Sequence, residues 1–157
     1  MKETSTHIYF WGSYLSNWFK CSFKDDQLTY PSSEAYLMAH KALLFNDKDS
    51  ADKIVKTNDP KKQKALGRLV KGFKEDTWNQ HKFDIMVKGL ILKFEQNPQL
   101  KKQLLATGNK ILVEGSPYDK IWGVGLHYED EFILNEKNWK GENLLGKALM
   151  EARNQLQ

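Results

Sequence analysis

A long amphipathic segment between residues 76 and 97 restricts the fold of this chain more than any other feature. Its large apolar side chains recur at close to helical spacing, at Trp78, Phe83, Ile85, Met86, Leu90, Ile91 and Phe94. Asp76 or Thr77 is suited to cap the first turn. Asn97-Pro98 ends the segment, because the residue before a proline disfavours helical backbone. We therefore predict one long helix here, which forms the spine of the hydrophobic core.

Shorter helices are predicted on both sides of this spine. Apolar side chains recur at helical spacing over residues 31–45, 50–57, 59–72, 100–105 and 143–157. In the first of these helices we expect Pro31 at the first helical position, with Ser32 and Ser33 in the first turn. Glu34 then lies close to the N-terminus of that helix.

Strand signals are confined to three short regions. Residues 7–11 are β-branched and aromatic and stop at Gly12-Ser13, while residues 20–23 and 27–30 flank a polar turn. We predict that the last two segments pair as a hairpin. Residues 132–134 are a further candidate for a brief strand.

Length and composition indicate one domain, because 157 residues are enough to bury a core without disulfides. The single Cys21 forms no internal disulfide, and the N-terminus lacks the apolar core of a signal peptide. No run of about 18 apolar residues is present, so we expect a cytoplasmic protein without a membrane partner. The net charge of +4 comes from lysines scattered among acids, which is compatible with a phosphate-bearing partner without demanding one.

Residues 112–126 are the segment hardest to explain as scaffold. They begin as a short apolar run, continue through a Ser-Pro turn signal and Asp119, and end in a tryptophan followed by two nearby glycines, Gly123 and Gly125. Loops of this kind usually carry function. A strand, a tight turn and a tryptophan that packs in the core explain the same residues equally well.

Glu34 and Asp119 are candidates for a pair of catalytic carboxylates, of the kind that glycosidic bond cleavage uses. Each also has a purely structural explanation. Acids in the first turn complement the helix dipole, and an aspartate in a turn accepts hydrogen bonds from its own backbone. The sequence pattern leaves both explanations open.

Aromatic and basic residues suggest the rest of a binding site. Trp78 and Trp122 each offer a large apolar face that stacks on a planar ring or packs in the core. Lys41 and Arg68 suit a phosphate group, the lysine as a point charge and the arginine through several donors, but solvated cations are common at protein surfaces.

The sequence contains no motif for metal binding, for dinucleotide or nucleotide-phosphate binding, or for a serine nucleophile. The histidines have no cysteine or acid at metal-ligand spacing, so we predict neither a metal nor a cofactor. Gly123-Val124-Gly125 lacks the third glycine and the following helix of a dinucleotide-binding fingerprint. A Walker-type loop and a nucleophile elbow are also absent.

Several motifs together resemble the YbiA-like, or NADAR, family. In chain order they are Leu15-Ser16-Asn17, Tyr30-Pro31-Ser32-Ser33-Glu34-Ala35-Tyr36, Lys41, Gly67-Arg68, Trp78, Met86, Lys93-Phe94-Glu95-Gln96-Asn97, Leu112-Val113-Glu114, Asp119, Trp122-Gly123-Val124-Gly125 and Asn143-Leu144-Leu145-Gly146. No single motif is diagnostic. Their order, residue types and spacing over almost the whole chain carry the resemblance.

The resemblance implies a helix-dominated α+β single domain over residues 1–157, with a small antiparallel β element. It implies an N-glycosidase whose substrate is a phosphoribosyl or ADP-ribosyl compound. The substrates associated with the family are phosphoribosyl pyrimidine intermediates of riboflavin biosynthesis and ADP-ribosyl-guanine in DNA. The alternative is a module that binds ADP-ribose or nucleotides without cleaving them. Two carboxylates argue against that alternative, because an anionic ligand gains nothing from them.

Motif matching also carries over residue roles. Glu34, Trp78 and Asp119 take the positions of the family's catalytic residues. The positions implied for substrate binding are Lys41, Arg68, Trp122, Gly123 and Asn17. We expect the fold to bring Glu34 and Asp119 into one cleft walled by indole rings. Ala35 stands where some relatives have histidine, which leaves the substrate preference open.

Overall fold

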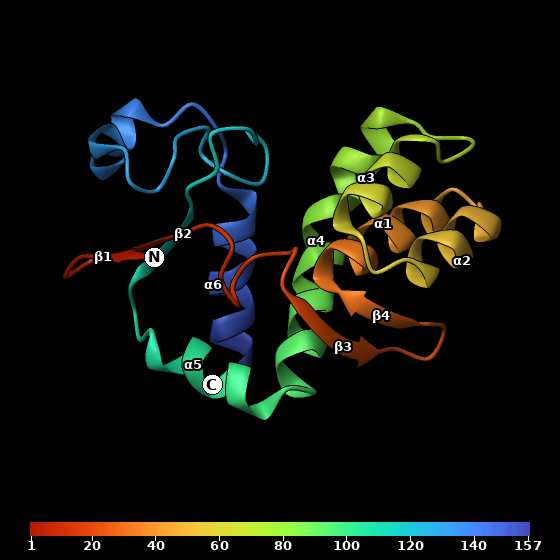
Figure 1. Cartoon of the computed structure of the whole chain (residues 1–157), viewed down its shortest axis with the longest axis horizontal. Coiled ribbons are helices and arrows are strands. Elements are labelled where there is room, and N and C mark those ends of the chain that lie inside the picture. The colour runs from red at the N-terminus through yellow and green to blue at the C-terminus, as the bar shows by residue number, and fades with distance from the viewer. The chain divides into compact units, whose positions relative to one another are not determined.

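The structure, a computed structural model, describes residues 1–157. Its helices are α1 (Ser33–Leu44), α2 (Lys48–Lys56), α3 (Pro60–Arg68), α4 (Glu75–Glu95), α5 (Pro98–Ala106) and α6 (Leu144–Leu156) (Figure 1). Its strands are β1 (Lys2–Glu3), β2 (His7–Phe10), β3 (Lys20–Lys24), β4 (Thr29–Ser32) and β5 (Ile111–Glu114). The 3-10 helices are η1 (Glu131–Leu134) and η2 (Glu136–Asn138). This content confirms the predicted helix-dominated α+β class.

The chain divides into two compact units. We call Asn17–Asn97 the central unit, and Met1–Ser16 together with Pro98–Gln157 the terminal unit. No helix of the structure combines the length and the apolar character needed to cross a membrane.

The central unit is built around α1. Helices α2, α3 and α4 pack against it, and the hairpin β3–β4 leads directly into it (Figure 1). The strands pair antiparallel, with Phe23 opposite Tyr30, which confirms the predicted hairpin. Both rings are buried and join Tyr36 and Ile54 in one apolar core.

Helix α1 begins later than the sequence predicts. Pro31 belongs to β4, and Ser32 is the N-cap, whose Oγ accepts a hydrogen bond from Ala35 N at 3.1 Å. The prediction of Pro31 as first helical residue was therefore wrong, because the Ser32 hydroxyl satisfies a free N–H group of the first turn. Glu34 becomes the second residue of the helix, at its positive dipole end.

The long helix α4 confirms the predicted spine, with 21 residues that end before Pro98. It starts slightly before the predicted caps, after Lys74, which makes no side-chain capping bond. Gly89 lets the helix approach α1 closely, because a Cβ there would overlap the ring of Tyr36. The helix also carries Lys93 into the protein, where this side chain is fully buried.

The burial of Lys93 leads us to expect that the stability of the protein depends on pH. Burial lowers its pKa to about 8. An unfolded lysine titrates near pH 10.4, so between about pH 8 and 10 the unfolded chain binds more protons and the free energy of unfolding rises with pH. Over these two units we expect a gain of roughly 2–3 kcal/mol relative to Lys93→Met. Urea unfolding of both proteins at pH 8, 9 and 10 measures it, and parallel pH curves would contradict the prediction.

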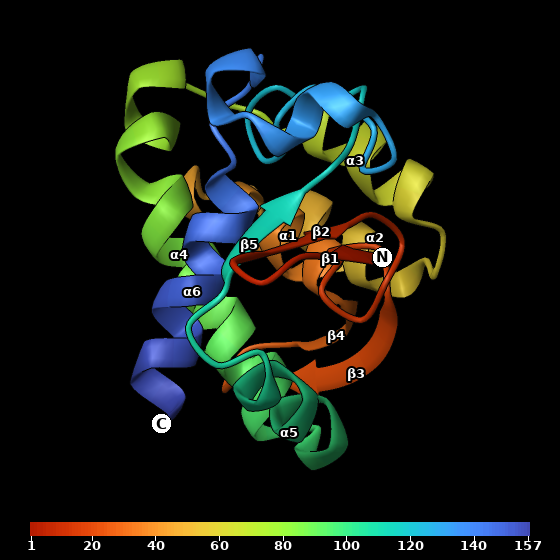
Figure 2. The same ribbon diagram turned by 90° about the vertical axis from the view of Figure 1, so that its left-hand side faces the viewer.

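The terminal unit contains a three-stranded sheet in the order β1-β2-β5. Strand β1 is antiparallel to β2, and β5 lies on the other side of β2 (Figure 2). Strands β2 and β5 run parallel, with Ile8 opposite Leu112 and Phe10 opposite Glu114. The sequence predicts strand 7–11 but does not predict this parallel pairing, since the two partners lie about a hundred positions apart. Helix α6 packs beside β5.

The strand expected at residues 132–134 is absent, and this segment belongs to the 3-10 helix η1. Asp130 caps it: its Oδ1 accepts from Phe132 N at 3.0 Å, and its carbonyl oxygen accepts from Ile133 N at 3.0 Å. Ile133 is buried while Phe132 and Leu134 are exposed. A single apolar anchor and a capping aspartate favour a turn over a strand.

Gly146 is required where α6 meets β5. A Cβ at this position would overlap the carbonyl oxygen of Leu112 and the side chain of Asn143. We expect Gly146→Ala to lower the free energy of unfolding by about 1–3 kcal/mol, because the helix must move away from the strand. Urea unfolding measures this loss. The exposed neighbour Lys147→Ala is the control, and equal stability of both variants would contradict the prediction.

Candidate active site

Glu34 is held at the start of α1 in the central unit. Its residue is only 7% exposed. Its backbone N–H donates to the carbonyl oxygen of Asn17 at 2.9 Å, which fixes the first turn of the helix. The positive end of the helix dipole favours a negative carboxylate here. The position therefore suits a group that must act as an anion.

Asn17 supports this first turn through its side chain. Ser33 Oγ donates to Asn17 Oδ1 at 2.9 Å, and Asn17 Nδ2 donates to Met86 Sδ at 3.4 Å. These buried contacts tie the start of α1 to α4. They give Asn17 a positioning function, and its direct contact with a substrate stays a prediction.

Lys41 lies about two turns after Glu34 along α1 and is half-buried. Burial lowers the pKa of Lys41, the nearby charge of Arg68 lowers it further, and the charge of Glu34 raises it. Its Nζ lies 5.8 Å from the centroid of the Trp78 ring. Within the central unit, Lys41 thus lies near Trp78 and is affected by the charges of Glu34 and Arg68, and the roles of these residues in binding and catalysis stay predictions.

Phe73 is a neighbour of Lys41 to which the sequence patterns assigned no role. Lys41 Nζ lies 4.6 Å from the centroid of its ring, closer than to Trp78. Phe73 belongs to the segment between α3 and α4 and is 41% exposed. A signal was present, since this ring follows a glycine within a lysine-rich stretch.

Asp119 closes a turn in the terminal unit. Its Oδ1 accepts hydrogen bonds from the backbone N–H groups of Ile121, at 2.9 Å, and Trp122, at 2.8 Å. The structural explanation offered for this residue is therefore correct, and its catalytic role stays a prediction. Asp119 and Trp122 are both half-buried.

The loop that contains Asp119 is attached to the start of α6. The backbone N–H groups of Asn143, Leu144 and Leu145 donate to the carbonyl oxygens of residues 123, 121 and 122, at 3.1, 3.1 and 3.0 Å. The first N–H groups of a helix have no acceptor within the helix, and here carbonyl oxygens of the loop accept their hydrogen bonds. The conformation of the loop therefore depends on α6.

Asn143 links the same helix to β5. Its Nδ2 donates to the carbonyl oxygen of Leu112 at 3.0 Å, and its Oδ1 accepts from Glu114 N at 3.0 Å. Its φ of 54° is left-handed, which asparagine tolerates better than most residues. Asn143 belongs to the motif Asn143-Leu144-Leu145-Gly146, which by itself does not predict this positioning function.

Gly123 is packed too tightly for any side chain. A Cβ there would lie 2.9 Å from the carbonyl oxygen of Asp119 and 3.3 Å from Glu114 Oε2. Glycine is thus needed for close packing, and its contact with substrate stays a prediction. The same contact places the carboxylate of Glu114 beside this loop, as a second acid for which the sequence pattern predicts no role.

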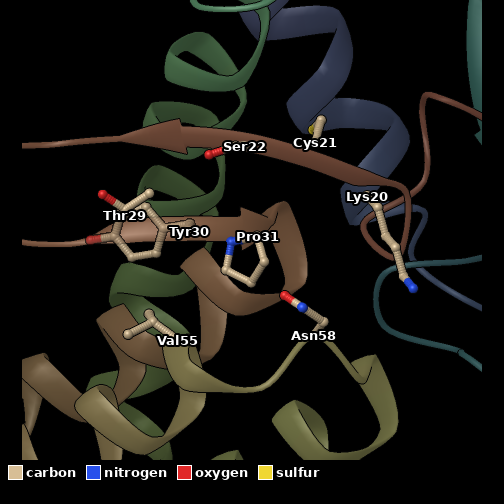
Figure 3. A pocket seen from close by; sticks show the side chains of 8 residues that line it. All are labelled: Lys20, Cys21, Ser22, Thr29, Tyr30, Pro31, Val55 and Asn58. Atoms are coloured by element: carbon tan, nitrogen blue, oxygen red, sulfur yellow. The ribbon is translucent and has the colours of Figure 1, made fainter.

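The expected cleft shared by Glu34 and Asp119 stays a prediction, because the two residues belong to different units. A hollow of about 560 Å³ lies elsewhere in the central unit, against the hairpin and α2 (Figure 3). The residues that line it are Lys20, Cys21, Ser22, Thr29, Tyr30, Pro31, Val55 and Asn58. None of them is a predicted site residue.

Known proteins resemble this chain over most of its length. N-glycosidase R617 of Acanthamoeba polyphaga mimivirus is 45% identical over 168 residues, which cover 99% of each protein. N-glycosidase YbiA of Escherichia coli (strain K12) is 36% identical over 90% of this chain and 80% of its own. The maize riboflavin biosynthesis protein PYRR, chloroplastic, is 33% identical over 83% of this chain and 20% of its own.

A solved structure and a family model agree with these relatives. The NMR structure of E. coli YbiA superposes with a TM-score of 0.78 at 32% identity, covering 99% of this chain and 87% of that one. The model of the NADAR domain matches residues 9–157. Because this match spans nearly every residue and includes the motifs that surround Glu34, Lys41 and Asp119, the chain belongs to the NADAR family.

Proposed function

We propose that this enzyme cleaves the bond between a base nitrogen and the anomeric carbon of a phosphorylated ribose. The class, a hydrolase of N-glycosyl bonds, follows from NADAR membership and from relatives named N-glycosidase at 45% and 36% identity. The proposed substrates are phosphoribosyl pyrimidine intermediates of riboflavin biosynthesis or ADP-ribosyl-guanine in DNA. We further propose that residues 1–157 act as one domain.

The surroundings of Lys41 are the observation that supports a phosphorylated glycoside as the substrate. Within one unit, the charges of the buried Glu34 and of Arg68 act on Lys41, whose Nζ lies 5.8 Å from the centroid of the Trp78 ring. Lys41 and Arg68 match the charge of a phosphate, and Trp78 offers a face for a base or a sugar. A phosphorylated glycoside presents all of these groups at once.

The proposed reaction needs a negative charge near the sugar. As the C–N bond breaks, the ribose develops oxocarbenium character, and a nearby carboxylate stabilises this state more than the ground state. Glu34 is proposed either to provide this charge or to take a proton from the attacking water. The water oxygen bonds to the anomeric carbon, and the bonding pair of the C–N bond leaves with the base.

The departing base must gain a proton, because a bare nitrogen anion is a poor leaving group. Asp119 is proposed to donate or relay this proton. Trp78 and Trp122 are proposed to orient the base or sugar by stacking, and Gly123 to let the substrate approach the backbone. Asn17 acts in this scheme by holding the first turn of α1.

Product analysis tests the proposal directly. The purified protein is incubated separately with the phosphoribosyl pyrimidine intermediates and with DNA that contains ADP-ribosyl-guanine. Release of free base with ribose 5-phosphate, or of ADP-ribose with restored guanine, identifies the substrate. Calorimetry that shows tight binding of either compound, with no product released, would instead support a module that only binds.

A further inference from the structure

The ammonium group of Lys41 is held by aromatic rings. Its Nζ lies 4.6 Å from the ring centroid of Phe73 and 5.8 Å from that of Trp78. Phe73 lies in the loop just before α4, and Trp78 lies in the first turn of that helix. An ammonium at these distances is attracted by the ring quadrupole.

Both contacts described for Lys41 Nζ are with neutral rings, and the charge of Glu34 also acts on this ammonium. A neutral ring attracts an ammonium without cancelling its charge, so a cation held in this way can still bind an anion. Burial and the charge of Arg68 both disfavour the charged form of Lys41, as its lowered pKa reflects. A bound anion would relieve both effects.

Phe73 is itself held in place. It follows Gly72, whose φ of +76° turns the chain, and its ring packs edge-on against Phe45 with centroids 5.4 Å apart. Just before this turn, Lys71 N donates to Asp47 Oδ2 at 2.9 Å. These contacts place the ring beside Lys41 although 41% of the residue is exposed.

We infer that Phe73 is a positioning residue of a phosphate subsite, in which its ring holds the Lys41 ammonium so that Lys41 and Arg68 together bind the phosphate group of the substrate. The inference rests on the proposed function for the identity of that substrate. A cation–π contact of this kind corresponds to an effect of about 3- to 30-fold on phosphate affinity.

Ribose 5-phosphate and ribose are the probes that test the inference about Phe73. Calorimetry or NMR titration measures the binding of each probe to the full chain. We expect Phe73→Leu, which keeps the apolar volume but removes the ring, to weaken ribose 5-phosphate binding about 3- to 30-fold. Phe73→Trp is expected to restore it, and ribose binding should not change. Leu69→Ala, at a 71% exposed site in the same segment, is the matched control.

A double-mutant cycle separates positioning from packing. In a Lys41→Met background, Phe73→Leu should have no further effect on ribose 5-phosphate binding. Additive effects, equal loss of ribose and ribose 5-phosphate binding, or parental affinity in Phe73→Leu would overturn the inference. If the wild type binds ribose 5-phosphate through Phe73 but hydrolyses neither proposed substrate, the proposed function fails while the subsite stands.

Discussion

Glu34→Gln is expected to reduce hydrolysis by about 10²–10⁴-fold while the protein stays folded. Glutamine keeps the shape of the side chain but removes the charge that the oxocarbenium-like state requires. The backbone hydrogen bond from residue 34 to Asn17 does not depend on the side chain, so the first turn of α1 should persist. Single-turnover rates with the substrate identified by product analysis measure the effect.

Glu75→Gln is the matched control, because Glu75 also lies in the first turn of a helix but is exposed. It should retain the parental rate and stability. A parental rate in Glu34→Gln would remove Glu34 from the mechanism. A large loss in both variants would indicate general damage to the helices.

The same substitution is expected to change the pH dependence of phosphate binding. The charge of Glu34 raises the pKa of Lys41 against the opposing effects of burial and Arg68. Without that charge the pKa of Lys41 falls further, so the ammonium loses its proton at a lower pH. Titrations of ribose 5-phosphate across pH 7–10 should therefore show the alkaline loss of affinity at lower pH in Glu34→Gln. Coincident curves would contradict this coupling.

Asp119→Asn is expected to lose most turnover, by about 10²–10⁴-fold, and to remain as stable as the parent protein. The amide oxygen of asparagine can still accept the two hydrogen bonds from Ile121 and Trp122, so the turn is preserved. The proton-transfer function is lost. Asp119→Ala removes the hydrogen-bond acceptor as well as the proton-transfer group, and should also lower the free energy of unfolding by about 1 kcal/mol.

The pair of variants distinguishes chemistry from loop geometry. If Asp119→Asn turns over at the parental rate while Asp119→Ala does not, Asp119 serves only to shape the loop. Asp130→Asn is the matched control, because Asp130 Oδ1 similarly accepts a backbone hydrogen bond, from Phe132 N at 3.0 Å. It should leave both rate and stability unchanged.

Local chemistry explains the elements that the sequence predicts correctly. The spacing of apolar side chains identified α4 and the helix that starts at Asp59, which caps α3 with its Oδ1 accepting from Lys61 N at 2.9 Å. The polar turn between β3 and β4 identified the hairpin. Each of these elements depends on residues within one or a few turns of one another. At Pro31 a serine cap outweighed the preference of proline for the first helical position, and at 132–134 an aspartate cap outweighed the apolar pattern.

The sequence by itself therefore determined the helices, the hairpin, the family motifs and the candidate residues of the site. Only the tertiary structure decided that β5 pairs parallel with β2, that Asn143 joins β5 to α6, and that Phe73 covers Lys41. The physical reason is that helical spacing and caps act between near neighbours in the chain. Strand pairing, close approach at a glycine and ring–ammonium contacts form between distant segments, and become favourable only when folding buries them together.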